Sequence, residues 1–355
     1  MSCRPKRGSG FPGYAFVANQ EGLTLAVVDL TSFSPARHIR LEAGPTAVAA
    51  NPARKTVYAL TPETGMVHQV DPLRLSVNRK TRVARRAVSM RLAPDGDSLW
   101  VLSSEPRELR RVRLDHFQAD RRIALPGGPV DMDLSRDGLM CAVSYGVEGF
   151  VSLLDLRAGR AVATVHAGTD TGTVRFRFDG EQLLVADRSR RLVTILETAT
   201  GRTVTNLQVA VKPEHFCIKP DGGEVFVTGE GMDAVVILDP YSTQVSETVL
   251  AGRAPGAMAM AASQPYLFVT NPPSGDVTIF NVDTRRAIAV VAVGSEPAYV
   301  TMTPDHQYAL VLNRRSGNMA VIRIGAIVPS RSRSAPLFTT VPVGSKPVCA
   351  AVLAV

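Results

Sequence analysis

The sequence lacks the motifs by which common enzymes and membrane proteins are recognised. Its 355 residues hold no Gly-x-Ser-x-Gly elbow, no His-Glu-x-x-His pair, no Walker loop and no Gly-x-Gly-x-x-Gly that opens a helix. No uninterrupted apolar run is long enough to form a transmembrane helix. The first absence favours a non-enzymatic protein, and the second argues against a helical membrane protein.

Sulfur and imidazole ligands are few and scattered. No Cys-x-x-Cys pair occurs, so we expect neither a disulfide framework nor a metal site, and cysteines in predicted strands are interpreted as small core residues. The histidines fall at different phases of the repeat described below, which argues against a histidine-bound metal or haem; no cofactor is expected. The four cysteines are Cys3, Cys141, Cys217 and Cys349. The six histidines are His38, His68, His116, His166, His215 and His306.

Basic residues exceed acidic ones, 40 against 32, for a net charge of +8. A basic field can attract nucleic acid or other anions. Alternatively, arginine stems simply cover apolar surface. The densest cluster, residues 79–91, lacks the interleaved aromatic side chains on which bases would stack, which favours the second interpretation.

A repeat of 42 residues runs through the chain. Its anchor is a proline that recurs at one phase, and Ala87 and Thr171 occupy the two positions where the proline is missing. A period of this length indicates a repeat architecture. The anchor prolines are Pro45, Pro129, Pro213, Pro255 and Pro297, followed by Pro347 after an insertion.

Each repeat reads as four short strands separated by Gly, Pro, Asn and Asp. In the unit that begins at Gly252, apolar strands are expected at 257–260, 266–270, 277–282 and 286–293. Four strands in about 42 residues is the spacing of a β-propeller blade. The second strand recurs eight times, from Tyr14–Asn19 to Ala309–Asn313. The sequence therefore predicts an all-β protein, a single closed propeller of four-stranded antiparallel blades.

The repeats resemble the YVTN family of bacterial β-propellers, which includes surface-layer-like proteins. The resemblance is clearest at Phe268–Asn271 followed by Ser274–Thr284, and it extends from Tyr14 to Val355. It implies a propeller and an extracytoplasmic location, periplasmic or at the cell surface. Members often have seven blades, whereas eight units are counted here, so seven remains the alternative.

The two ends of the chain are expected to share one blade. The first copy enters directly at its second strand, Tyr14, and the last anchor is followed only by an innermost-strand pattern, Val348–Val355. We predict that this C-terminal strand completes the N-terminal blade and closes the ring, which protects strand edges. The domains are then a flexible basic arm, residues 1–13, and the propeller, residues 14–355.

The phase of the repeat separates core positions from channel positions. The third and fifth residues after each anchor are apolar throughout, whereas polar residues appear in between. Arg91, Asp133 and Arg175 occupy one slot in three successive blades, which indicates either a structural salt-bridge ladder or one wall of an anion site. The candidate ligand-binding residues of the channel are Arg91, Asp131, Asp133, Arg175, His215 and Tyr299.

Further candidates lie in loops expected at the mouth of the channel, beside the anchor turns. Acidic residues nearly balance them, and most are interpreted as solvated loop charges. The insertion 325–337 is expected to be an exposed loop. The mouth candidates are Arg85, Arg86, Arg188, Arg190, Arg191, Arg314 and Arg315.

The N-terminus has no signal peptide as written. Cys3 before a polar stretch also resembles the mature start of a lipoprotein, which would give a lipid anchor if the true start lies upstream.

Three functions follow as hypotheses. The first is a non-catalytic scaffold for a protein, a surface polymer or a small anion. The second is a lactonase-like propeller hydrolase that uses channel residues, and the third is nucleic-acid binding through arginine clusters.

Overall fold

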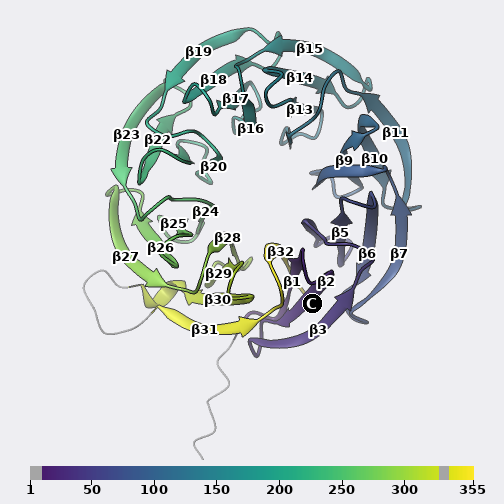
Figure 1. The fold of residues 1–355 in the computed structure, drawn as a ribbon, viewed down its shortest axis with the longest axis vertical. Coiled ribbons are helices and arrows are strands. Elements are labelled where there is room, and N and C mark those ends of the chain that lie inside the picture. The colour runs from purple at the N-terminus through teal and green to yellow at the C-terminus, as the bar shows by residue number, and fades with distance from the viewer. Residues whose placement is uncertain (1–9, 328–335) are drawn as a thin grey trace, which may run out of the picture.

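Short antiparallel strands make up most of the structure, a computed structural model that describes residues 10–327 and 336–355. They form eight four-stranded sheets around a central axis (Figure 1). The eight units counted in the sequence are thus eight blades of a β-propeller, and the seven-blade alternative is wrong. Blade 1 consists of β1 (Gly13–Asn19), β2 (Thr24–Asp29), β3 (Ser34–Arg40) and the C-terminal β32 (Pro347–Ala354).

The remaining blades follow in chain order, each with its first strand innermost. Blade 2 consists of β4 (Ala47–Asn51), β5 (Thr56–Thr61), β6 (Met66–Asp71) and β7 (Ser76–Arg82). Blade 3 consists of β8 (Arg86–Leu92), β9 (Ser98–Glu105), β10 (Arg107–Arg113) and β11 (Gln118–Ala124). Blade 4 consists of β12 (Asp131–Leu134), β13 (Met140–Ser144), β14 (Phe150–Asp155) and β15 (Arg160–His166). Blades 5 and 6 are β16 (Thr171–Phe176), β17 (Gln182–Asp187), β18 (Leu192–Glu197) and β19 (Thr203–Gln208); β20 (His215–Ile218), β21 (Val225–Thr228), β22 (Ala234–Asp239) and β23 (Gln244–Leu250). Blades 7 and 8 are β24 (Met258–Met260), β25 (Tyr266–Asn271), β26 (Asp276–Asn281) and β27 (Arg286–Ala292); β28 (Pro297–Met302), β29 (Tyr308–Asn313), β30 (Asn318–Arg323) and β31 (Leu337–Pro342).

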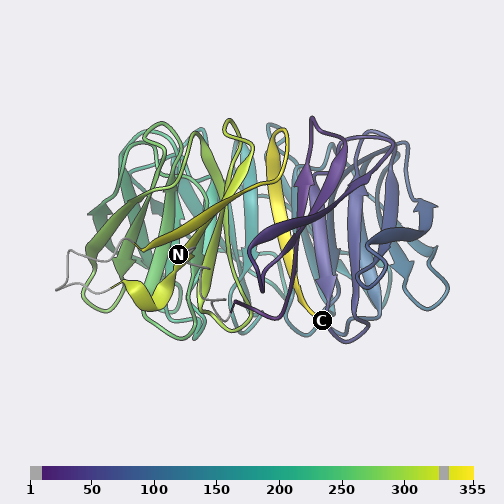
Figure 2. The ribbon, with the colours of Figure 1, turned by 90° about the horizontal axis from the view of Figure 1, so that it is seen from below.

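The C-terminal strand closes the ring as predicted. β32 pairs antiparallel with β1, with Leu353 opposite Tyr14 and Cys349 opposite Ala18 (Figure 2). Blade 1 is also bonded to blade 8, because the buried Asn19 donates from Nδ2 to the Val343 carbonyl, which follows β31, at 2.6 Å. No edge of the ring is left open, which removes a site of edge-to-edge aggregation.

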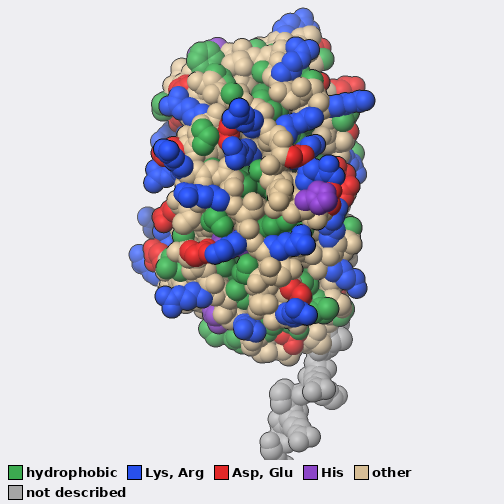
Figure 3. Space-filling view, turned by 90° about the vertical axis from the view of Figure 1, so that its right-hand side faces the viewer, with side chains coloured by type: hydrophobic (Ala, Val, Ile, Leu, Met, Phe, Trp, Pro, Cys, Tyr) green, Lys and Arg blue, Asp and Glu red, His purple; other side chains and the backbone are tan. Residues whose placement is uncertain are grey.

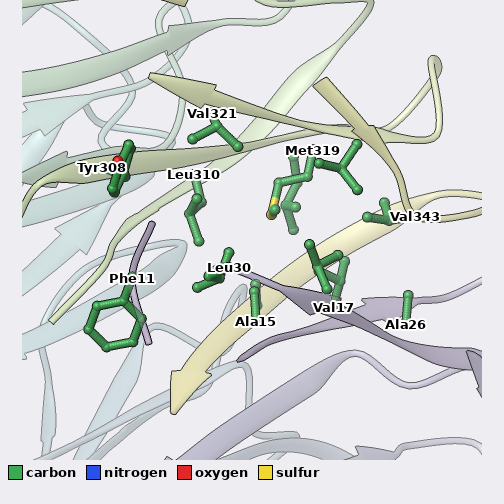
Figure 4. Packing of buried hydrophobic residues seen from close by; sticks show 14 residues of the cluster. Phe11, Ala15, Val17, Ala26, Leu30, Tyr308, Leu310, Met319, Val321 and Val343 are labelled. Carbon is green, nitrogen blue, oxygen red and sulfur yellow. The ribbon is translucent and has the colours of Figure 1, made fainter. Parts of the chain in front are cut away.

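Apolar side chains fill the space between neighbouring blades. Between blades 8 and 1, Leu310 and Val321 belong to one apolar cluster with Ala15 and Ala26 (Figure 4). Because both faces of each sheet are covered, the second strands are buried almost throughout and read as apolar runs rather than as an alternation. Phe11 belongs to the same cluster, so ordered packing begins before the expected start at residue 14. Residues 1–9 of the predicted arm, with Cys3, lie outside the described residues.

Aspartate–glycine turns join the first and second strands of several blades. In blade 3 the Asp95 carboxylate accepts a hydrogen bond from the Asp97 backbone N–H at 2.9 Å, and Gly96 has φ +72°. Blade 4 repeats this with Asp137 and Gly138, φ +71°. A side-chain acceptor and a residue that tolerates positive φ are what such a tight turn requires.

Helix is nearly absent from the described residues. They contain one 3-10 turn, η1 (Ile324–Ala326), and no helix in them has the length and hydrophobicity to cross a bilayer. The predicted insertion begins within η1, and its central part, residues 328–335, lies outside the described residues.

Candidate functional site

Each innermost strand directs alternate side chains toward the preceding and the following blade. The third and fifth residues after the anchor pack in the core as predicted; Met90, Met132 and Val174, for example, are at most 5% exposed. The second and fourth residues, called the inner slots here, face the following blade beside the central axis. Polar side chains in these slots make up the candidate site.

The first inner slot commonly joins a blade to the backbone of the next one. Thr173 Oγ1 donates to the Glu214 carbonyl at 2.5 Å, and Tyr299 OH donates to the Ala350 carbonyl at 3.2 Å. Such bonds satisfy polar groups at the free edge of an inner strand. A polar residue in this slot therefore has a structural function in several blades.

Asp131 fills the same slot in β12 and is the centre of the charged cluster. Its Oδ2 accepts hydrogen bonds from Arg175 Nη1 at 2.8 Å and from the Val174 backbone N–H at 3.2 Å. Its Oδ1 lies 4.0 Å from Arg91 Nη2. One carboxylate thus faces two guanidinium groups from the blades on either side.

This arrangement corrects the predicted ladder, in which Asp133 stood between the two arginines. Asp133 Oδ2 instead accepts the backbone N–H of Phe176 at 3.0 Å. The residues do share one slot, but an arginine side chain extends several ångströms along the wall from its own backbone. The nearest carboxylate is therefore the one two residues earlier, Asp131.

Burial and charge shift the pKa values within this cluster. Burial raises the pKa of Asp133, although Arg175 and the Phe176 N–H favour its ionised form. Burial also disfavours the charge of Arg175, but the two neighbouring aspartates outweigh it and raise the pKa of Arg175. Arg175 is thus held as a cation that Asp131 neutralises.

Arg91 is less well satisfied than Arg175. Its side chain is 41% exposed, its contact with Asp131 is long, and its Nε is buried without a hydrogen-bond partner in the described part of the chain. The buried hydroxyl of Ser89, two residues away on β8, also lacks a partner there. β8 therefore presents unused donors beside the axis.

His215 and Tyr299 complete the set on other blades. His215 keeps an exposed surface at the axis, yet the surrounding wall partly desolvates it; this burial, and then the positive charges of Arg175 and Arg314, lower the pKa of its imidazole. Burial raises the pKa of Tyr299 to about 12, with Cys349 adding to the shift and Arg91 opposing it. The charge of Arg91 on blade 3 thus acts on Tyr299 of blade 8.

The loops after the second strands do lie beside the anchor turns. Backbone bonds join them, such as Arg85 N–H to the Glu105 carbonyl at 2.8 Å and Arg314 N–H to the Glu296 carbonyl at 2.9 Å. Arg188 is held by two hydrogen bonds to Asp170, at 2.6 and 3.1 Å. Among the predicted mouth arginines, Arg314 acts on a channel residue, because its positive charge helps to lower the pKa of His215. The exposed ones are Arg85, Arg86, Arg190, Arg191 and Arg315.

Sequence reasoning missed a second polar cluster, around His68 on β6. His68 Nε2 lies 3.1 Å from Thr61 Oγ1 and 3.6 Å from Glu42 Oε2. Both contacts use the same nitrogen, so the ring cannot relay a proton between them as in a catalytic triad. The sequence feature that could have revealed this cluster is a histidine within a buried third strand. The equivalent position in most other blades is apolar or carries a small hydroxyl side chain.

Metal ligation finds no support among the described residues, which contain no group of three or more histidine, cysteine or acidic side chains with suitable geometry. Cys141 is buried, and Cys217 and Cys349 are half-buried; all three are free thiols.

No known family profile and no curated protein matches the sequence. Among solved structures, the dihydro-heme d1 dehydrogenase NirN in complex with DHE superposes with a TM-score of 0.79 at 15% identity, over 99% of this chain and 77% of that one. Hydrazine synthase from Kuenenia stuttgartiensis superposes with a TM-score of 0.60 at 19% sequence identity, over 92% of this chain and 99% of that one. A functionally unknown protein from Desulfotomaculum acetoxidans superposes with a TM-score of 0.65 at 12% sequence identity, over 96% of this chain and 99% of that one. These likenesses support the fold alone.

Proposed function

We propose that the chain is a binding propeller that takes a small anionic ligand at its central axis. The site consists of Arg91, Arg175 and His215, with Arg314 supplying further positive charge from the mouth. Asp131 neutralises Arg175 and fixes its position, so Arg91 is the group left to pair with a ligand. Arginine suits carboxylate or phosphate because it offers a planar fork of donors.

The observation that carries this proposal is the contrast between Arg91 and Arg175. Both stand in the second inner slot and both face Asp131, but only Arg175 makes a short bond to it. Partly buried cationic donors without partners are costly unless something satisfies them. An anion at the axis would do so.

The inner slots of three other blades support a ligand that also has an apolar part. They carry small side chains: Ala257 and Ala259 in blade 7, Ala351 in blade 1, and Ala47 and Ala49 in blade 2. Ligand sites typically combine an apolar lining with a few placed polar groups.

The hydrolase alternative rests on one observation, the lowered pKa of His215, which keeps its imidazole neutral and able to accept a proton near pH 7. No carboxylate in the described residues hydrogen-bonds this ring to orient it. Binding without catalysis is therefore the function we favour. The resemblance to YVTN repeats is the only support for our further proposal of membership in that family and of an extracytoplasmic location.

Titration calorimetry with citrate, pyrophosphate and benzene-1,3,5-tricarboxylate tests the proposal. We expect at least one of these to bind, and Arg91→Gln to weaken that binding tenfold or more. Arg315→Gln, an exposed mouth arginine, is the matched control and should leave affinity unchanged. Equal affinity in wild type and Arg91→Gln, or no binding of any of the three anions, would contradict an anion site here.

A further inference from the structure

Positive charge is concentrated on one part of the outer wall of the ring. The outermost strands of blades 1, 2 and 3 are β3, β7 and β11, and their Lys and Arg residues are called the basic wall here. Figure 3 shows this side of the molecule with lysine and arginine side chains spread over it. The basic wall consists of Arg37, Arg40, Arg79, Lys80, Arg82, Arg121 and Arg122.

The outermost strands of blades 5 to 8 are almost free of cations. β19 and β31 carry no charged residue, β23 carries only Glu247 and β27 only Arg286. All eight outermost strands have the same place in the fold. The propeller therefore does not require cations there, and those of the basic wall need another explanation.

Several of these cations form no ion pair within the described part of the chain. Lys80 pairs with Glu42, whereas Arg121 donates to the Leu156 and Arg157 carbonyls at 2.5 and 2.9 Å, which leaves its charge uncompensated. Arg40, Arg79 and Arg122 are exposed and make no ion pair within residues 10–327 and 336–355. Free charges of one sign on neighbouring strands form a field that attracts an oppositely charged partner.

A groove of about 500 Å³ lies within the basic wall, between β3 and β7. Arg40 and Lys80 supply its cations, Leu41 and Val77 its apolar lining, and Glu42 and His68 complete it. The His68 side chain is only 2% exposed, so it is part of the floor. The groove thus offers an apolar contact next to two basic groups.

We propose that the basic wall docks an acidic, leucine-containing segment of a protein partner, with the groove between β3 and β7 as the anchor point. The acidic side chains pair with Arg40, Arg79 and Arg122, and an apolar side chain enters the groove. This surface is separate from the central axis and does not depend on the ligand proposed there.

Two observations favour a protein over nucleic acid. No Phe, Tyr or Trp stands on β3, β7 or β11, and His38 is the one aromatic ring on these strands, so unpaired bases would find little surface to stack on. Acidic side chains are also interspersed, with Glu42 beside Lys80 and Asp120 bonded to Arg111 at 2.9 Å. A continuous phosphate backbone would be repelled at these points, whereas a protein surface can match an alternating pattern.

Fluorescence anisotropy of the full chain with three labelled probes tests this proposal. The probes are a twenty-residue peptide of repeated Glu-Leu-Glu-Asp, polyglutamate of the same length, and a twenty-base-pair DNA duplex. We expect the leucine-containing peptide to bind most tightly and its affinity to fall steeply with salt. The variant Arg40→Glu/Arg79→Glu/Arg122→Glu should weaken it at least tenfold.

The matched control is Arg190→Glu/Arg286→Glu/Arg315→Glu, which makes the same change in net charge away from the wall. It should weaken peptide binding less than twofold, and unchanged melting temperatures would show that both variants fold. Equal weakening by both variants overturns the proposal, because net charge alone would then explain binding. Tightest binding to the duplex overturns it in favour of nucleic acid, and equal affinity for the two peptides removes the groove as an anchor.

Discussion

Two junctions between blades place very different side chains in the same inner slots. At the junction of blades 4 and 5, Asp131 and Asp133 of β12 bond to the backbone of β16 and to Arg175. At the junction of blades 7 and 8, the slots hold Ala257 and Ala259, and Ala259 packs against the core shared with blade 8. Alanine therefore suffices for two blades to pack. The charged residues at the first junction exceed what the fold demands, which is why we connect them with binding.

The largest expected effect on stability comes from removing the strand that closes the ring. Deleting residues 348–355 removes β32, which is the innermost strand of blade 1 and also lines the junctions with blades 2 and 8. The edge of β1 is then exposed, and we expect aggregation and loss of a cooperative melting transition. Size-exclusion chromatography and calorimetry measure this. Removing Val355 alone is the control, and a soluble, cooperatively melting 1–347 protein would contradict the closure.

A smaller effect is expected from breaking the charged junction at its centre. Asp131→Ala leaves the partly buried Arg175 without its carboxylate and the Val174 N–H without an acceptor. We expect a loss of about 2 kcal/mol in the free energy of unfolding, measured by urea denaturation. Asp131→Asn keeps an acceptor for the backbone and should lose about half as much.

The reciprocal change sharpens the same comparison. Ala259→Asp introduces a carboxylate at the alanine junction, where the inner slots of blades 7 and 8 hold no cation. We expect destabilisation of about 1–3 kcal/mol from a desolvated charge. If neither Asp131→Ala nor Ala259→Asp changed the free energy of unfolding, the charged junction and the alanine junction would be equivalent for stability, which would contradict this comparison.

The sequence was informative where the repeat constrains it. Ring closure, the blade count and the core positions all follow from one period, because every blade has to pack in the same way. The period did not predict that Arg175 pairs with Asp131, because the position of a residue in the repeat does not determine how far its side chain extends. His68 was missed because it departs from an apolar strand in one copy only, and its partner Glu42 comes from the preceding blade's connection.

An acid-dependent loss of stability is expected from His68. Burial lowers the pKa of its imidazole, an effect that Glu42 opposes and Lys80 reinforces. A depressed folded-state pKa gives stability that is fully present above the unfolded value near 6.5 and is lost as pH falls toward the folded value. Between pH 7.5 and 5.5 we expect wild type to lose on the order of 1 kcal/mol more than His68→Asn, as measured by urea denaturation at each pH. Parallel pH profiles of the two proteins would argue against this assignment.

The smallest expected effect separates the two aspartates of β12. Asp133 differs from Asp131 because burial raises its pKa, which means that its charge disfavours the folded state at neutral pH. Asp133→Asn retains an oxygen for the Phe176 N–H and removes that charge, so we expect a gain of a few tenths of a kcal/mol at pH 7. The gain should begin to shrink as pH falls through the folded-state pKa and should vanish below the unfolded value near 3.9, where Asp133 is protonated in both states. Urea denaturation at pH 7 and pH 3 measures the gain and its loss. A loss at pH 7 as large as that of Asp131→Ala would show that the two carboxylates hold the junction together in the same way.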